Sequence, residues 1–170
     1  QKDTLRELIL TYLQECSDYK HTGANELLGD IYREGLYDVP VNYRKAFDHY
    51  RTGANFNGGS CYSKLHQMLS NGELSLSSGK QEALDMFALL GARLHEEDMI
   101  IETIKAYRAG RLSKHAAEIE KYHLPAYRNL SASEEDRDTV LIDGSAVTFK
   151  QLTAIASLMI TLGNTDGLHD

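Results

Sequence analysis

The chain has 170 residues, of which 42% are hydrophobic and 25% are charged, and its formal net charge is −7 at pH 7. This length and apolar content suit one domain, or one domain with a small appendage, that buries a continuous core. The negative charge argues against nucleic acid or an anionic membrane as partner, because such binders need a basic face to neutralise phosphates. The longest mostly apolar run, residues 152–162, is too short to cross a hydrocarbon layer, so we expect no membrane span.

The first predicted element is an amphipathic helix within residues 1–22, which we expect to cap the array of helix pairs or to supply half of a preceding pair. One face of this helix collects the apolar residues Leu5, Leu8, Ile9, Tyr12 and Leu13. Because the chain begins at Gln1 rather than Met, we expect that an upstream segment was removed, by truncation or by processing of a signal.

Residues 23–129 carry an internal repeat with steps of 37 and 38 residues. A large residue followed three positions later by glycine recurs as Tyr32 and Gly35, Leu69 and Gly72, and Tyr107 and Gly110. Apolar residues at intervals of four predict a first helix before the glycine, and Ala46 with Tyr50, echoed by Ala83 with Phe87, predicts a second helix after it. The sequence therefore predicts an all-α fold, an α-solenoid of helix pairs over 23–58, 59–94 and, in degenerate form, 95–129.

The connection inside the first repeat also has a defined chemistry. Pro40 cannot sit inside a helix, and Asn42 can cap the helix that follows. In the second repeat, residues 76–79 take the place of this loop. Within each repeat we expect a small residue of one helix to pack against the aromatic residue of its neighbour, so that the two backbones approach closely.

Residues 24–54 carry a more specific pattern, which includes Ala24, Leu28, Gly29, Tyr32, Gly35, Val39, Pro40, Ala46, Tyr50, Gly53 and Ala54. This stretch resembles a Sel1-like repeat, a relative of the tetratricopeptide repeat. The second repeat departs from the family pattern at His66, where the family has glycine, and at Leu69, where it has tyrosine. In the first repeat, Tyr37 and Asp38 stand where the family pattern has a glycine before Val-Pro.

The resemblance implies a binding surface. In tetratricopeptide-like stacks the first helix of each pair lines the concave side, so residues that flank the packing positions should face a groove. The partner-binding residues expected on this basis are Glu26, Asp30, Arg33, Glu34, Ser63, Gln67, Ser70, Asn71, Lys105 and Arg108. The alternative is an ordinary solvated helix face, with binding through the convex side, the loops or the C-terminal appendage.

The last segment, residues 130–170, departs from the repeat. It starts with a polar, acidic linker that ends at Asp138, and continues with a predicted small β-hairpin that turns at Asp143-Gly144, a dipeptide that tolerates positive φ. Thr148 should cap a last helix that ends near Leu162, and the tail beyond it should fray.

The thiol and titratable side chains form no site motif. Cys16 and Cys61 match no zinc or redox spacing and are interpreted as packed thiols; a bridge between them would imply an exported protein. The seven histidines include no pair at i, i+4, which favours surface positions, with His66 as the exception. Acidic residues 96–98 and 134–136 lie where helices should start, and the helix dipole explains them. We therefore predict no catalytic residue, no metal and no cofactor.

The expected function is a non-catalytic protein–protein interaction module, whose partner is a peptide, a loop or a globular protein. Bacterial Sel1-like proteins include exported adaptors, regulators of envelope signalling and immunity proteins that neutralise secreted toxins. The resemblance therefore favours an exported or periplasmic location over a cytoplasmic one. Two alternatives stay open: a hydrolase-like enzyme related to cysteine-rich Sel1-like proteins, whose repeated cysteine pairs this chain lacks, and a fragment of a longer scaffold solenoid.

Overall fold

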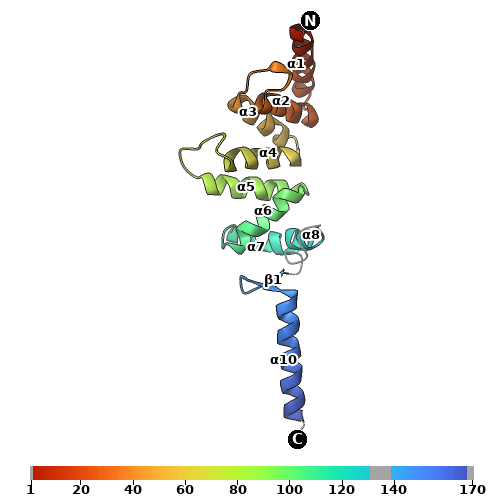
Figure 1. Cartoon of the computed structure of the whole chain (residues 1–170), viewed down its shortest axis with the longest axis vertical. Coiled ribbons are helices and arrows are strands. Elements are labelled where there is room, and N and C mark those ends of the chain that lie inside the picture. Colours follow the sequence, from red (N-terminus) through yellow and green to blue (C-terminus); the bar gives the residue numbers. More distant parts are fainter. Residues whose placement is uncertain (1, 131–138, 168–170) are drawn as a thin grey trace. The chain divides into compact units, whose positions relative to one another are not determined.

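The computed structural model describes residues 2–130 and 139–167. It divides into two compact units, one ending at Thr103 and the other beginning at Ile104. Helices dominate both units, and among the described residues the strands are confined to one small hairpin of the second unit (Figure 1). The predicted all-α class is confirmed at this level.

The first unit is built from consecutive helices joined by short connections. Its elements are α1 (Lys2–Asp18), α2 (Thr22–Glu34), the 3-10 turn η1 (Leu36–Asp38), α3 (Tyr43–Asn55), α4 (Gly59–Ser70), α5 (Lys80–Arg93) and most of α6 (Glu97–Arg108). Each helix from α1 to α4 packs against the next helix in the sequence. The pairs α2–α3 and α4–α5 occupy the positions that the repeat predicts, and α6 begins at the acidic residues expected to start a helix.

Local chemistry sets where these helices begin and end. The Asn42 side chain accepts a hydrogen bond from the backbone N–H of Lys45 (3.0 Å), which confirms it as the cap of α3. Helix α2 ends at Gly35, whose φ of 70° favours glycine. Tyr37 and Asp38 also have positive φ, 56° and 60°, at the place where the Sel1-like pattern has glycine. These two residues therefore carry backbone strain.

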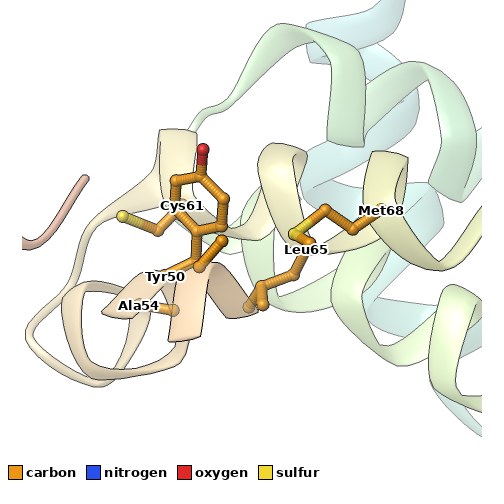
Figure 2. Packing of buried hydrophobic residues seen from close by; sticks show 6 residues of the cluster. Tyr50, Ala54, Cys61, Leu65 and Met68 are labelled. Atoms are coloured by element: carbon orange, nitrogen blue, oxygen red, sulfur yellow. The ribbon is translucent and has the colours of Figure 1, made fainter. Parts of the chain in front are cut away.

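Two buried clusters form the core of the first unit. One joins α3 to α4 through Ala46, Tyr50, Ala54, Cys61, Leu65 and Met68 (Figure 2). The other joins α1, α2 and the loop after α2 through Leu13, Ala24, Leu28, Ile31 and Val39. Tyr32 packs against both clusters, so the core is continuous across these helices.

Gly29 lets α2 and α3 approach closely, as the repeat pattern predicts. A Cβ at Gly29 would lie 2.3 Å from Cε1 of Tyr50, far inside normal contact distance. Tyr50 is fully buried, and its hydroxyl donates to Oδ1 of Asp30 (2.5 Å). Close approach through glycine recurs between α5 and α6, where a Cβ at Gly91 would lie 2.4 Å from Cγ of Met99.

The predicted apolar face of α1 is only partly buried. Leu13 is buried and Ile9 packs beside it, but Leu5, Leu8 and Tyr12 are 60%, 62% and 66% exposed. The side of α1 that contacts α2 also includes Leu10 and Cys16, which the predicted face did not contain. The helix has two overlapping apolar stripes, and only the contact with α2 decides which of them is buried.

The second unit continues from α6 through a run of short helical turns. These are η2 (Ser113–His115), α7 (Ala116–Glu118), the π-helical turn η3 (Ile119–His123) and α8 (Leu124–Arg128). The Tyr107 hydroxyl donates to the carboxylate of Glu120, and Nε2 of His123 lies 2.7 Å from the carboxylate of Glu118. The segment that the degenerate repeat assigns to a second helix is therefore divided into short pieces.

The C-terminal hairpin and helix are present as predicted. Strands β1 (Thr139–Ile142) and β2 (Ser145–Thr148) pair antiparallel, with Thr139 opposite Thr148, and the turn residues Asp143 and Gly144 have φ of 50° and 80°. Helix α10 (Phe149–Gly167) begins with a capping box: Thr148 Oγ1 accepts from the N–H of Gln151 (3.1 Å), and Gln151 Oε1 accepts from the N–H of Thr148 (2.9 Å).

Helix α10 is longer than expected. It continues past Leu162 and Gly163. The prediction that the helix ends near Leu162 is therefore wrong, and so is the prediction that the chain frays from Gly163 onward. A single glycine inside a helix costs only about 1 kcal/mol, which is not enough to end it. The predicted linker beyond Leu130, its acidic residues 134–136 and the end of the tail, 168–170, lie outside the described residues. Within the described part, no helix has the length and apolar character needed to cross a membrane.

Candidate partner-binding face

A ladder of polar contacts joins α2 to α4. Its partners are 34 residues apart: Ser60 Oγ donates to Glu26 (2.6 Å), Arg33 Nη1 donates to Gln67 Oε1 (3.3 Å), and between them Lys64 Nζ lies 3.4 Å from Asp30 Oδ1. Successive contacts lie one turn apart along each helix. We call these three pairs the polar ladder.

Similar contacts continue from α4 to the part of α6 in the first unit. Ser63 Oγ donates to Oδ2 of Asp98 (3.4 Å), and Nε2 of His66 lies 4.0 Å from Oε2 of Glu102. The first helices of successive repeats are therefore linked to one another, in addition to their contacts with the second helices. We call this line of contacts between α4 and α6 the seam. The side chain of His66, which stands where the family pattern has glycine, lies in this seam.

The strongest polar contact on this side of the unit joins Arg33 to Glu73, just after α4. Arg33 Nε and Nη2 donate to the two carboxylate oxygens of Glu73 at 2.8 and 2.9 Å, a two-pronged geometry. The side chains are 13% and 18% exposed. The hydrogen bonds from Arg33 lower the pKa of Glu73, and those to Glu73 raise the pKa of Arg33.

Asp30 connects the polar ladder to the core. Its Oδ1 accepts from the Tyr50 hydroxyl and also lies within ion-pair distance of Lys64. Burial raises the pKa of Tyr50, and the hydrogen bond to Asp30 raises it further, so this hydroxyl remains a donor at neutral pH. Asp30 is therefore engaged within the chain from two sides.

The acidic residues at the start of α6 lie close to Glu26. Burial raises the pKa of Glu96, and the neighbouring charges of Asp98, Glu26 and Glu97 raise it further. Several carboxylates therefore gather near this end of the polar ladder. Among the described residues no group of three or more histidine, cysteine, aspartate or glutamate side chains is arranged to hold a metal ion.

The structure divides the predicted partner-binding residues of the first unit into three groups. Glu26, Asp30 and Arg33 are half-buried and take part in contacts between helices. Ser63 is buried, so its predicted place on a groove surface is wrong: its hydroxyl lies in the seam between α4 and α6. The exposed members on α2 and at the end of α4 are Glu34, Gln67, Ser70 and Asn71.

Lys105 and Arg108 belong to the second unit. Lys105 is exposed, whereas Arg108 is half-buried with its guanidinium 5.1 Å from the centre of the Tyr127 ring. Two guanidinium nitrogens of Arg108, Nε and Nη2, are buried and make no hydrogen bond with the described residues. Arg108 therefore packs mainly as a flat side chain against an aromatic ring.

Sequence reasoning missed Ser60, Lys64 and Glu73. The repeat step of 37 residues identifies equivalent positions, but the ladder partners are 34 residues apart. A residue of one first helix thus contacts the next first helix one turn before its own equivalent. Opposite charges at this shorter spacing, such as Asp30 and Lys64, were the signal that could have found the ladder.

The two cysteines are free thiols, which agrees with the packed-thiol interpretation. Cys61 is fully buried between α3 and α4, beside Tyr50 and Leu65 (Figure 2). Burial raises the pKa of Cys61 to about 12, so its thiol stays protonated at neutral pH. The described contacts therefore give it a packing role.

No protein-family model, curated protein or solved structure matches this chain. The Sel1-like resemblance therefore stays a prediction from the residues themselves.

Proposed function

We propose that the protein is a non-catalytic protein–protein interaction module, built as a short α-solenoid of Sel1-like helix pairs. The polar ladder is the observation that carries the proposal. Side chains on α2 meet side chains on α4 at a constant spacing of 34 residues, which is what stacked equivalent helix pairs would produce. The close approach of Gly29 and Tyr50, at positions expected from the repeat, supports the same architecture.

The ladder also limits which residues can meet a partner. Glu26, Asp30 and Arg33 are engaged inside the chain, so a partner would have to break those contacts to use them. Glu34, Ser70 and Asn71 keep exposed surface beside the ladder, as does Gln67 at its end, and we call these four residues the α2/α4 face. A basic or mixed partner fits best, because the chain carries a net charge of −7.

The test is capture of a partner by wild type and by a variant of the α2/α4 face. Glu34→Lys/Ser70→Lys reverses one charge and adds another at two exposed positions outside the ladder. The matched control is Ser78→Lys/Glu82→Lys, which makes the same chemical changes at Ser78, just before α5, and at Glu82, within α5. We expect the first variant to lose the captured protein and the control to retain it. Equal capture by both variants would reject the α2/α4 face as the binding surface.

Charge reversal of Glu26 or Asp30 is a poorer test, because it would disturb the ladder and the Tyr50 hydrogen bond together. The proposed partner class follows the resemblance: an envelope protein, if the chain is an adaptor or regulator, or a secreted toxin, if it is an immunity protein. For either role the resemblance favours an exported or periplasmic location over a cytoplasmic one. Identification of the captured protein by mass spectrometry separates these roles.

The longer-scaffold hypothesis also has an observation in its favour. Leu5, Leu8 and Tyr12 form an exposed apolar stripe on α1, of the kind that a neighbouring helix would cover in an array. We therefore keep a scaffold role as the second candidate, in which α1 contacts a further helix pair.

A further inference from the structure

A hollow of about 360 Å³ lies between α1 and α2. Its lining combines apolar residues, Leu10, Leu28 and Tyr32, with polar residues that include Gln14, Glu15 and Asp18. This volume falls in the range of sites that hold a small ligand or one large side chain. The acidic residues of the hollow lie on α1, whereas its apolar lining comes from both helices, Leu10 from α1 and Leu28 and Tyr32 from α2.

The charges around the hollow are of one sign. Glu15 and Asp18 are exposed carboxylates on the α1 wall, and none of the lining residues is basic. Asp18 accepts a hydrogen bond from the side chain of Gln14, one turn before it on α1 (3.1 Å). On the α2 side, Nζ of Lys45 in α3 lies 5.2 Å from the centre of the Tyr32 ring, and His49 stacks on that ring at 5.6 Å. A positively charged guest is therefore attracted to the α1 side of the hollow.

We propose that this hollow receives a lysine or arginine side chain from an extended segment of the protein partner. Such a side chain has an apolar stem and a charged end, and it lies along apolar surface while the end stays in a polar environment. Here the stem would contact Leu28 and Leu10, and the charged end would pair with Glu15 and Asp18. The inference rests on the proposed interaction function and names the chemistry of the partner.

A neutral apolar guest fits the hollow less well, because it would bury two carboxylates without pairing them. An acidic guest would be repelled by Glu15 and Asp18. The hollow uses residues of α1 that the α2/α4 face does not include, so the two surfaces can be tested independently. Failure of one test leaves the other informative.

The experiment is a titration of the ¹⁵N-labelled full chain with a capped five-residue peptide that carries one arginine between serine and glycine residues. The matched peptide carries glutamine in place of arginine. We expect the arginine peptide to shift the amide signals of Glu15, Asp18 and Leu28, and the glutamine peptide to leave them in place. Glu15→Gln/Asp18→Asn should weaken binding of the arginine peptide at least about fivefold, since it removes two exposed ion pairs.

The control variant Glu7→Gln/Glu82→Gln removes two exposed carboxylates at other places and keeps the hollow intact. It should bind the arginine peptide as wild type does. Equal weakening in both double variants would mean that the peptide responds to the overall negative charge, and would overturn the proposal. Equal shifts with the two peptides would overturn it as well. Neither result bears on capture through Glu34 and Ser70, so a failure here is distinct from a failure of the proposed function.

Discussion

Replacement of Gly29 by alanine tests the packing on which the proposed repeat architecture depends. The added Cβ would lie 2.3 Å from Cε1 and 2.5 Å from Cδ1 of Tyr50. Tyr50 is fully buried and its hydroxyl is held by Asp30, so the ring cannot move without the loss of that hydrogen bond. We therefore expect Gly29→Ala to destabilise the protein, although alanine is the better helix former.

The magnitude follows from three opposing effects. Insertion of a methyl group into a packed contact costs about 1–3 kcal/mol. Loss of the hydrogen bond to a charged acceptor adds about 1.5 kcal/mol. The higher helix propensity of alanine returns about 1 kcal/mol. The expected decrease in the free energy of unfolding is therefore about 2 kcal/mol.

Urea unfolding followed by far-UV circular dichroism measures this change. Gly163→Ala in α10 is the control, because a Cβ there meets nothing within 4 Å, and this variant should not lose stability. In a Tyr50→Leu background the smaller side chain leaves room, so the cost of Gly29→Ala should nearly disappear. The reasoning is refuted if Gly29→Ala costs the same in both backgrounds, because the cost would then not come from the contact with Tyr50.

Three further predictions concern other contacts of the first unit. Glu73→Gln should lower the free energy of unfolding by about 2 kcal/mol at pH 7, because it leaves Arg33 without its charged partner, whereas Glu34→Gln should have little effect in the same urea assay. The folded-state pKa of Glu73 lies below its usual 4.5, so its stabilisation is present above that pH and is lost as the pH falls through the lowered value; wild type, but not Glu73→Gln, should show this loss. At Tyr37, where φ is 56°, the glycine variant should be more stable than the alanine variant by about 1 kcal/mol, and equal stabilities would contradict the assigned backbone strain. Cys61 should resist iodoacetamide at pH 8 in the folded protein and react in urea, as followed by mass spectrometry, since its pKa is about 12; rapid modification of the native protein would contradict its burial.

Some parts of the fold were predictable because their causes are local. Asn42 caps α3 through its own side chain, and the Asp143-Gly144 turn needs only residues that accept positive φ. Thr148 likewise begins α10 by bonding to a residue three positions away. The kind of contact that Gly29 makes with Tyr50 was also expected, because a small residue of one helix should pack against the aromatic residue of its neighbour within a repeat.

The binding site was harder to predict, because the residue types could be recognised but their partners could not. Arg33 is a charged residue of the kind expected to line a groove, yet it is held by Glu73, which lies 40 positions later in the chain, just after α4. Ser63 is polar and flanks a packing position, yet it is buried in the seam between α4 and α6. Which polar residues stay available depends on the stagger between helices, and the spacing of 37 residues does not fix that stagger.

The sequence by itself determined the helical class, the positions of the helix pairs, the caps and the hairpin turn, since each depends on apolar periodicity or on residues within a few positions of one another. The tertiary structure alone decided which stripe of α1 is buried, which carboxylates are paired and where the hollow between α1 and α2 lies. These features depend on the rotation and stagger of one helix against another. Those quantities are set by the sum of many side-chain contacts between residues far apart in the chain.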